Sequence, residues 1–559
     1  MLYTTHELVA PRPFGRSSLL CAVCGVILVG CGGTTEPKAV LSSITVTLSA
    51  SSIAVGSSTT ASAVGRDQKD APMSTGSVTW SSSTSSVATV SASGIVSGVG
   101  VGQATIIAAA SGKQGQATVT VTPPPVANVT VSPASASLLV AQQQQLTATP
   151  KDASSSALSG RGVTWSTSSA AIATVTTDGL VQAVGAGTAT ITATSEGGTG
   201  TAAVTVAQFR MIATDYNMTC SLTTAGAAYC WGDNGYCNLG DGTGKQRLSP
   251  TAVSGGMTFA TIAPGSVATC GLNTAGSAYC WGDPTGGTVG DGNSAPTCRL
   301  APTTVSGGLT FATIATHGQT CGLTSAGAAY CWGYNFSGQL GEGTKTNRTT
   351  PTPVSGSLMF ATVSAGYFQT CALTTAGWAY SWGDNSYGQL GDGTLTQRLS
   401  PTPVSGGMTF AAITTGNSHT CALTAAGAAY CWGYNGKGQL GDGSQTNRTT
   451  PTAVSGGLKF ASVSAGYFQT CALTTAGLAY CWGDNSYGQL GDGTLTQRLT
   501  PTAVSGGMTL AAIATGNLHT CALAATGAAY CWGDNSKGKL GDGTTTNRTT
   551  PTLVVLPVP

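Results

Sequence analysis

The sequence predicts an all-β protein in which two β-sandwiches precede a seven-bladed β-propeller. Its composition suits strands and turns, because the 559 residues include 79 Gly, only 8% are charged, and runs of Leu, Glu and Lys are nearly absent. Two similar segments come first, and seven copies of a shorter unit follow. The net charge of +2 comes without a basic tract, so we expect no nucleic acid among the partners.

The first 30 residues have the pattern of an export signal. Arg12 and Arg16 supply positive charge, and the apolar stretch 19–29 is too short to span a membrane in the mature protein. This stretch runs into the tetrapeptide LVGC at 28–31, which resembles the lipobox of bacterial lipoproteins. The alternative is an ordinary signal peptide followed by a chance Cys.

The lipobox resemblance implies a signal peptide at 1–30, acylation of Cys31 and a short tether over 31–40. Gly32 after the Cys implies, by the sorting pattern of such lipoproteins, the outer membrane or the cell surface. We therefore expect an exported chain that meets the membrane through a lipid anchor.

Two segments of similar pattern, 41–122 and 126–207, follow the tether. Each has a Val-Thr-Trp-Ser stretch and later alternating strands, and Trp80 and Trp165 mark the repeat at a spacing of 85 residues. Period-2 alternation in short pieces predicts a β-sandwich for each segment. Both resemble the bacterial immunoglobulin-like group 2 (BIG2) domain, and the prolines at 123–125 form a stiff spacer.

Residues 208–559 repeat with a period of about 50 residues. Each of the seven units has a Cys, a Trp-Gly pair and four strand-like pieces, most clearly between Phe460 and Val504. Four short strands per unit, repeated seven times, predict a propeller. The unit resembles the RCC1-type repeat, which implies that seven units close a ring. The predicted fold class is thus all-β, with two immunoglobulin-like β-sandwiches followed by a seven-bladed RCC1-like β-propeller.

The order of the pieces also predicts how the ring closes. The first unit has no Pro-Thr-x-Val strand before it, and the last unit ends in such a strand at 551–555. We expect this C-terminal strand to complete the first blade, because such a clasp removes an exposed sheet edge.

Paired cysteines recur in six of the seven units, with nine residues between the two members. Each pair flanks a turn that ends in Gly, so the two Cys lie opposite each other on a hairpin. Opposed residues are close enough for a disulfide, and export brings the chain into an oxidising compartment. The expected disulfides are Cys220–Cys230, Cys270–Cys280, Cys321–Cys331, Cys421–Cys431, Cys471–Cys481 and Cys521–Cys531. The alternative is a row of buried free thiols that serve as apolar packing.

Three cysteines of the repeats stand outside these pairs. Ser381 replaces the second Cys of the fourth unit, which leaves Cys371 free. Cys237 and Cys298 lie in loops of the first two units, and the sequence leaves open whether they pair across adjacent blades. No His stands at ligand spacing beside a Cys pair, so we expect no metal site and no cofactor.

An acid and a base recur in the same loop of every unit. A Gly-Asp-Gly turn, with Glu in the third unit, precedes an Arg before the Pro strand. The acids are Asp241, Asp291, Glu342, Asp392, Asp442, Asp492 and Asp542, and the bases are Arg247, Arg299, Arg348, Arg398, Arg448, Arg498 and Arg548. We expect intrablade ion pairs or backbone caps, and the alternative is a ring of charge that a ligand could use. Calcium is not predicted, because the ladder of oxygen ligands of an EF-hand loop is missing.

Loop aromatics are the candidate binding residues. They lie in turns or beside strand ends, where propeller loops commonly form a binding rim. The candidates are Tyr367, Phe368, Tyr387, Tyr467, Phe468 and Tyr487. The alternative is packing of one loop on another. His419 and His519 occupy one repeat slot in separate blades, so we expect strand-end residues there rather than catalysts.

The propeller lacks the sequence signs of an enzyme. Nearly every polar residue is a copy within a repeat, whereas catalysis needs a unique, asymmetric constellation. There is no nucleophile elbow, no phosphate loop and no metal-ligand cluster in the sequence. We therefore predict a non-enzymatic, surface-anchored binding or adhesion protein that recognises a protein or a glycan. BIG2 domains are frequent in bacterial adhesins, which favours this function by analogy.

Three alternative functions follow from the resemblance and the fold. One is a secreted inhibitor, as in an RCC1-like propeller that inhibits a β-lactamase. Another is a nucleotide exchange factor, which is disfavoured because an exported chain would not meet a nuclear GTPase. The third is a polysaccharide-acting enzyme that uses the central channel.

Overall fold

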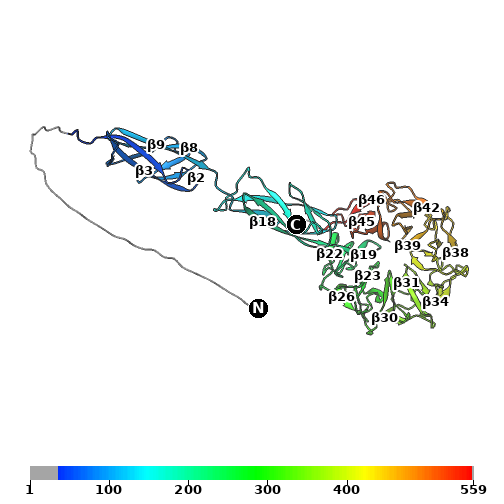
Figure 1. Cartoon of the computed structure of the whole chain (residues 1–559). Coiled ribbons are helices and arrows are strands. Elements are labelled where there is room, and N and C mark those ends of the chain that lie inside the picture. Colours follow the sequence, from blue (N-terminus) through cyan, green and yellow to red (C-terminus); the bar gives the residue numbers. More distant parts are fainter. Residues whose placement is uncertain (1–35, 557–559) are drawn as a thin grey trace, which may run out of the picture. The chain divides into compact units, whose positions relative to one another are not determined.

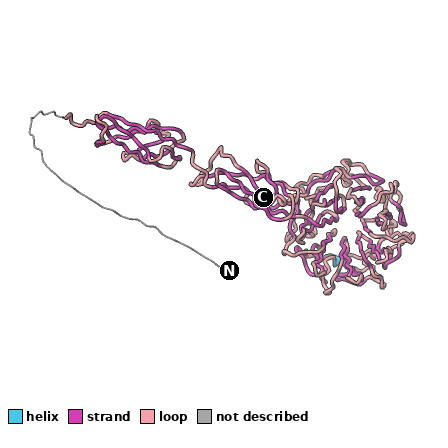
Figure 2. The backbone as a smooth tube through the Cα atoms, in the orientation of Figure 1, coloured by secondary structure: helices cyan, strands magenta, loops and turns pink. Residues whose placement is uncertain are grey.

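The computed structural model describes residues 36–556, so the expected signal peptide, Cys31 and the first part of the tether lie outside the described residues. The described chain is almost entirely strand and turn, with one 3-10 turn at Thr285–Gly287 (Figure 2). It divides into two units at the end of the proline spacer, 1–125 and 126–559. The predicted all-β fold class is confirmed.

The first unit is a two-sheet sandwich. One sheet has the order β1-β3-β7-β6 with β4 beside β3, and the other has the order β2-β9-β8-β5. The strands are β1 (Leu41–Leu48), β2 (Ser52–Ala54), β3 (Ser58–Asp67), β4 (Pro72–Met73), β5 (Thr79–Ser82), β6 (Ala88–Val90), β7 (Ile95–Gly98), β8 (Gly102–Ala110) and β9 (Lys113–Thr122). Alternate residues of β8 and β9 point inward, and Ile106 and Val119 are fully buried in the core.

The second sandwich begins the second unit. Its main sheet has the order β11-β18-β17-β14, with β12-β16-β15 and β10-β13 beside it. The strands are β10 (Asn128–Ser132), β11 (Ser135–Leu139), β12 (Gln143–Gln145), β13 (Thr147–Lys151), β14 (Thr164–Thr167), β15 (Ala173–Val175), β16 (Leu180–Ala183), β17 (Gly187–Ser195) and β18 (Gly198–Ala207). Ile191 and Val204 lie at the centre of its core.

Seven four-stranded antiparallel sheets form a ring of blades (Figure 1). The first strands are β19 (Phe209–Asp215), β23 (Thr261–Ala263), β27 (Thr313–Thr316), β31 (Phe360–Ala365), β35 (Ala412–Thr415), β39 (Phe460–Ala465) and β43 (Leu510–Thr515). Each of them contacts the first strands of both neighbouring blades, including β43 with β19. The first strands therefore surround the central channel, and the ring is closed.

The other strands of each blade follow outward in chain order. The second strands are β20 (Met218–Thr223), β24 (Ala268–Leu272), β28 (Gln319–Leu323), β32 (Gln369–Thr374), β36 (His419–Leu423), β40 (Gln469–Thr474) and β44 (His519–Ala524). The third strands are β21 (Ala228–Gly232), β25 (Ala278–Gly282), β29 (Ala329–Gly333), β33 (Ala379–Gly383), β37 (Ala429–Gly433), β41 (Ala479–Gly483) and β45 (Ala529–Gly533). The fourth strands are β22 (Arg247–Ala252), β26 (Arg299–Thr304), β30 (Arg348–Pro353), β34 (Arg398–Pro403), β38 (Arg448–Ala453), β42 (Arg498–Ala503) and β46 (Arg548–Leu553).

Consecutive antiparallel strands give the propeller two different faces. One face carries the short turns between first and second strands and the long loops between third and fourth strands, and we call it the long-loop face. The opposite face carries the turns between second and third strands, and we call it the hairpin face. In that turn of the sixth blade, Gly477 has a φ of +77° and ends the expected three-residue loop.

The expected C-terminal clasp is wrong. Strand β46 pairs with β45 and completes the last blade, while the first blade is built entirely from β19–β22. The reason lies in the register, because each Pro-Thr-x-Val strand pairs with the Trp-Gly strand of its own unit, as Thr251 does with Cys230. Every unit is thus a whole blade, and no strand is left over for exchange.

A repeated side-chain joint closes the ring instead. Trp231 Nε1 and Thr219 Oγ1 of the first blade both donate to Lys539 O of the last, at 3.0 and 2.9 Å. The same joint links the fifth and sixth blades, where Trp482 Nε1 and Thr470 Oγ1 donate to Gln439 O at 2.9 and 2.8 Å. A buried Trp and a buried Thr therefore tie each such blade to the carbonyl of the blade before it.

All six expected Cys pairs are disulfides, with Cα atoms 4.1 Å apart in every pair. Cys237 and Cys298 also form a disulfide, which links the long loops of the first two blades. Cys371 is buried and free, and Ser381 Oγ donates to its sulfur at 2.8 Å. The seven disulfides are typical of an extracellular protein.

The fourth blade allows a direct test of what a hairpin disulfide contributes. We expect Ser381→Cys to form a bond with Cys371, because these residues are paired in the same register as the cysteines of the other blades. The bond should raise the free energy of unfolding of the propeller by about 2–3 kcal/mol, since it closes a short loop. Guanidinium denaturation without reductant measures the effect, with Ser381→Ala, which cannot form the bond, as control. Equal stability of Ser381→Cys and Ser381→Ala would contradict the expectation.

The second sandwich packs against the last blade. Gln142 Nε2 donates to Leu556 O at 3.0 Å, and Leu556 N donates to Gln142 Oε1 at 3.2 Å. Ala528, beside the turn between β44 and β45, is part of the core of this sandwich. Gln208 Nε2 donates to Thr526 O in the same turn at 2.9 Å. These contacts involve the hairpin face of the blade, at the end opposite the long loops.

Candidate functional site

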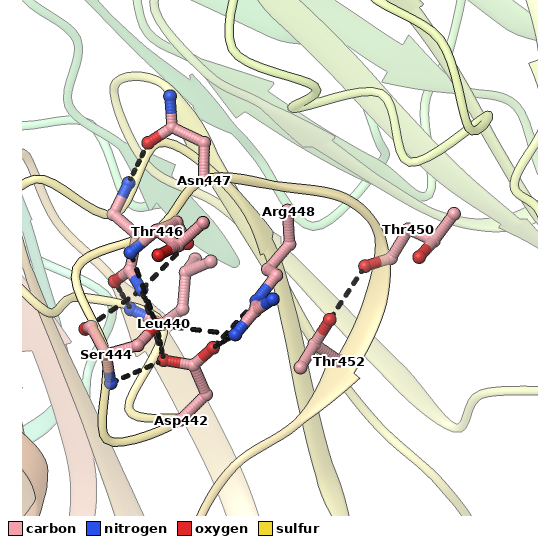
Figure 3. Close-up of polar contacts among 9 residues, drawn as sticks. Leu440, Asp442, Ser444, Thr446, Asn447, Arg448, Thr450 and Thr452 are labelled. Atoms are coloured by element: carbon pink, nitrogen blue, oxygen red, sulfur yellow. Dashed lines mark hydrogen bonds and ion pairs between the residues drawn. The ribbon is translucent and has the colours of Figure 1, made fainter.

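The long loops are held by buried carboxylates. In the fifth blade, Asp442 Oδ1 accepts from Ser444 N and Ser444 Oγ at 2.9 and 2.8 Å, and Oδ2 accepts from Arg448 Nε at 2.8 Å (Figure 3). Asn435 spans the loop, donating to Ser444 O and Thr446 O and accepting from Leu440 N. The hydrogen bonds and the Arg448 charge outweigh burial and lower the pKa of Asp442.

All seven blades use this acid–base pair within the loop. The ion pairs are Arg247–Asp241, Arg299–Asp291, Arg348–Glu342, Arg398–Asp392, Arg448–Asp442, Arg498–Asp492 and Arg548–Asp542. The side chains of the acids are 1–10% exposed, whereas those of the arginines are 19–38% exposed. The acids are therefore used up in contacts within their own loops. The intrablade reading holds, and the loops are a firm platform rather than a free ring of negative charge.

The aromatic candidates all lie on the long-loop face. Tyr367 contacts Phe368 and Tyr467 contacts Phe468, each with ring centroids 4.3 Å apart. Tyr387 belongs to the long loop of the fourth blade, and Tyr487 to that of the sixth.

Tyr434 joins these candidates across three blades. Its ring centroid lies 5.0 Å from that of Tyr387 and 5.7 Å from that of Phe468. In the third blade Tyr334 stacks on Phe336 at 5.4 Å. Sequence reasoning missed these three rings. The signal was a Trp-Gly-Tyr-Asn stretch in the third and fifth units, where four others have Trp-Gly-Asp-Asn.

Several of these aromatics are open to solvent. The exposed fractions are 62% for Phe336, 42% for Tyr387 and 41% for Tyr487, and Tyr236 in the long loop of the first blade is 46% exposed. Leu395 and Leu495 in the long loops of the fourth and sixth blades are also exposed, as are other apolar side chains elsewhere. Exposed aromatic side chains on rigid loops are typical of binding surfaces, because they lose little conformational freedom on contact.

His419 and His519 serve the seams between blades. Both are fully buried, and their Nε2 atoms lie 2.9 and 3.0 Å from Thr470 Oγ1 and Thr219 Oγ1 of the following blade. Burial lowers the pKa of His419 to about 3 and that of His519 well below its usual value. These histidines are therefore neutral packing residues at neutral pH.

A polar pocket lies at the mouth of the central channel on the long-loop face, where first strands of the blades end. It contains a pair that sequence reasoning missed, since His317 Nε2 lies 3.3 Å from Asp215 Oδ1. Burial raises the pKa of Asp215 well above its usual value and lowers the pKa of His317 to about 4. The pair comes from the first and third blades and is not a product of the repeat.

The sequence does mark this pair, at the position that follows the first strand of each blade. The residue that follows the first strand is Gly416 in the fifth blade and Gly466 in the sixth, and a Cβ atom on Gly416 would lie 2.2 Å from Gly466 O. Asp215 stands in this slot in the first unit, and His317 stands there in the third, whose turn is one residue shorter. Two non-Gly residues in a slot of glycines mark a local departure from the repeat.

Within residues 36–556 the structure has no cluster of three or more potential metal ligands. Among the same residues, no helix is long and apolar enough to cross a membrane.

Family models match three parts of the chain. The bacterial Ig-like domain (group 2) matches residues 40–121 and 125–206. The RCC1-like domain matches 359–558, and the Regulator of chromosome condensation (RCC1) repeat matches 326–373. No curated protein matches the chain.

Solved structures share the propeller fold. The crystal structure of Kap60 bound to yeast RCC1 (Prp20) is 21% identical with a TM-score of 0.53, over 62% of this chain and 85% of that chain. Prp20p from Saccharomyces cerevisiae, studied for binding to Gsp1p and histones, gives 21% and 0.51, over 61% and 86%. Human WBSCR16 gives 22% and 0.54, over 59% and 94%. The chain thus combines two bacterial Ig-like domains of group 2 with an RCC1-like propeller.

Proposed function

We propose that this chain is a surface-anchored recognition protein whose propeller binds a protein partner through its long-loop face. The main support for this proposal is the group of aromatic side chains on that face, among which Phe336, Tyr387 and Tyr487 are exposed to solvent. Similar propellers in solved structures are described with protein partners, namely Kap60, Gsp1p and histones. The domain content favours a protein-binding role for this chain as well.

The architecture supports binding in two ways. The second sandwich contacts the hairpin face of the last blade through Ala528 and Gln208, so these contacts leave the long loops available. The loops are fixed by buried acids such as Asp442 and by the disulfide Cys237–Cys298. A surface that is already ordered binds with a smaller loss of conformational entropy.

Binding rather than catalysis is the proposed mode of action. The acids and bases of the loops neutralise each other within each blade, and His419 and His519 are buried in the seams. Asp215 and His317 form a pair in the pocket, but His317 Nε2 faces Asp215 and His317 Nδ1 has no hydrogen-bond partner within the described residues. The imidazole is therefore not hydrogen-bonded to any hydroxyl of the lining, as a general base would be to its nucleophile.

The proposed binding surface predicts an effect confined to one face. Phe336→Ser should weaken binding to the target cells by about tenfold or more, because a single exposed aromatic anchor often dominates an interface. Flow cytometry with the labelled chain on neighbouring or host cells gives the readout. The matched control is Trp378→Ser, which removes an aromatic residue of 48% exposure from the hairpin face. Equal loss in both variants would contradict the proposed face, and loss of binding after glycan removal would redirect the proposal to a glycan.

Anchoring by a lipid is the second part of the proposal, and it rests on Cys31 in the Leu-Val-Gly-Cys stretch and on the export indicated by the disulfides. Cells that express the chain should incorporate labelled palmitate into it, and Cys31→Ala should abolish the label and release the chain from the membrane fraction. Membrane retention of the unlabelled variant would argue against a lipid anchor.

A further inference from the structure

The pocket at the channel mouth breaks the symmetry of the propeller. It is lined from the first, second, third, fourth, fifth, sixth and seventh blades, and its empty space amounts to about 590 Å³, including the part open to solvent. Asp215 and His317 are the two lining residues that stand where five other blades have Gly. Their side chains are 6% and 15% exposed, so the pair lies in the wall of the pocket rather than on the rim.

Three polar atoms of this wall are buried without a hydrogen-bond partner within the described residues. They are Thr214 Oγ1 beside Asp215, and Thr316 Oγ1 and His317 Nδ1 in the third blade. All three residues line the pocket. Buried polar groups are almost always satisfied in native proteins, and leaving them unpaired costs free energy. Their concentration in one pocket indicates that a ligand or ordered water completes them.

The donors and acceptors of the pocket favour a cation over an anion. Asp215 supplies a carboxyl group, and Thr214 and Thr316 supply hydroxyls that can accept hydrogen bonds. No Lys or Arg lines the pocket, so an anion would find no opposite charge among the lining residues. Burial favours the protonated form of Asp215, and a positively charged donor would favour its ionised form through a charge-assisted hydrogen bond to the carboxylate.

Tyrosine side chains line the same pocket as this acid or contact its histidine partner. Tyr216 and Tyr467 line the pocket, and the Tyr367 ring packs edge-on against His317 with centroids 5.2 Å apart. Burial, followed by the charges of Tyr216, Tyr467, Tyr236 and Asp215, raises the pKa of Tyr367. A carboxyl group among aromatic rings is the chemistry that recognises ammonium groups, through ion pairing and cation–π attraction.

We propose that the channel mouth is a subsite for an ammonium group, namely the side chain of a lysine presented by the protein partner. This inference deepens the proposed function and rests on it for the source of the lysine. The ammonium donates to the Asp215 carboxylate and to the hydroxyls of Thr214 and Thr316, while the aliphatic stem passes between the tyrosines. The exposed aromatics of the long-loop face then contact the surface that carries the lysine.

The subsite can be tested with a small probe and the full chain. Saturation-transfer NMR with Nα-acetyl-lysine methylamide should show binding in the millimolar range, as expected for a single anchored group. The uncharged norleucine analogue should bind at least about tenfold more weakly, because it cannot pair with the carboxylate. A panel of methyl glycosides should show no comparable binding.

Two variants separate the subsite from folding. Asp215→Gly places at this position the residue that five other blades have, so the propeller should fold while the lysine probe loses about tenfold or more in affinity. Thr316→Val removes a buried hydroxyl that has no hydrogen-bond partner, so it should not lower the melting temperature of the chain. It should weaken the binding of the lysine probe. Asp233→Asn removes a carboxylate that does not line the pocket and serves as the matched control.

The outcomes are decisive in both directions. Selective loss in Asp215→Gly and Thr316→Val with retention in Asp233→Asn supports the lysine subsite. The proposal is overturned if the norleucine analogue binds as tightly as the lysine probe, if a glycoside binds more tightly, or if Asp215→Gly leaves the affinity for the lysine probe unchanged. If the subsite test fails and Phe336→Ser still weakens cell binding, the proposed function stands without the lysine subsite. If neither Phe336→Ser nor Asp215→Gly weakens cell binding, the long-loop face is not the binding surface.

Discussion

Lys539→Met should open the propeller at the seam between its last and first blades. Lys539 is fully buried, with Nζ 2.6 Å from Asp534 Oδ2 and 2.9 Å from Asn217 Oδ1 of the first blade. Burial lowers the pKa of Lys539, while the Asp534 carboxylate opposes this shift. Removal of the ammonium leaves a nearly buried carboxylate unpaired, and such a loss costs about 3–5 kcal/mol. Urea denaturation followed by tryptophan fluorescence measures the change.

The repeat supplies the matched control for this variant. The same slot holds Gln389 in the fourth blade and Gln489 in the sixth, where Nε2 donates to Asp384 and Asp484 at 2.6 and 2.7 Å. Lys539→Gln should therefore keep a hydrogen bond to the acid and lose no more than about 1 kcal/mol. Hydrogen exchange should quicken in β19 and β43 of Lys539→Met ahead of the other first strands. Uniform exchange across all blades would show that the seam holds no special weakness.

His419→Gln should make the propeller more resistant to acid. The pKa of His419 is about 3 in the folded chain against an ordinary value of 6.5, because burial disfavours the charged ring. Between these values the unfolded chain binds a proton that the folded chain does not, so stability is greatest above pH 6.5 and falls as the pH drops. By about pH 4 the loss from this one residue is about 3 kcal/mol.

The substitution has a natural precedent in the same slot. Gln369 and Gln469 donate to the turns of the following blades at Gly416 O and Gly516 O, both at 3.1 Å. His419→Gln should thus fold normally at neutral pH, and its advantage over the parent chain should grow steadily on acidification below pH 6.5. Denaturation midpoints measured at about pH 7, 5.5 and 4 test this difference. A constant difference across that range would show that His419 does not titrate as expected.

The sequence predicts most of the fold because the same pattern of Cys, Gly and Trp-Gly positions recurs in seven units. The hairpin register follows from Gly477 and from the paired Cys471 and Cys481, and the disulfides and loop ion pairs follow from the same spacing. The expected clasp failed because periodicity does not reveal where a repeat begins and ends in space. Only the pairing of Thr251 with Cys230 shows that each unit closes its own sheet.

The candidate site was harder to predict, for the opposite reason. Copies of a motif are easy to see, whereas Asp215 and His317 matter because they are not copies. They lie 102 positions apart in the numbering, and their 3.3 Å approach depends on the curvature that brings the first and third blades to one channel mouth. Tyr434 was overlooked in the same way, since it replaces an Asp of the repeat.

The self-contained blade also has an evolutionary consequence. Because β46 stays with β45 and the ring is joined through Trp231, Thr219 and Lys539 O, no strand is shared between the two ends of the propeller. Duplication or loss of a gene segment that encodes one unit therefore adds or removes one complete blade and leaves no partial blade behind. A circularly permuted chain that starts at another seam should be able to reach the same ring.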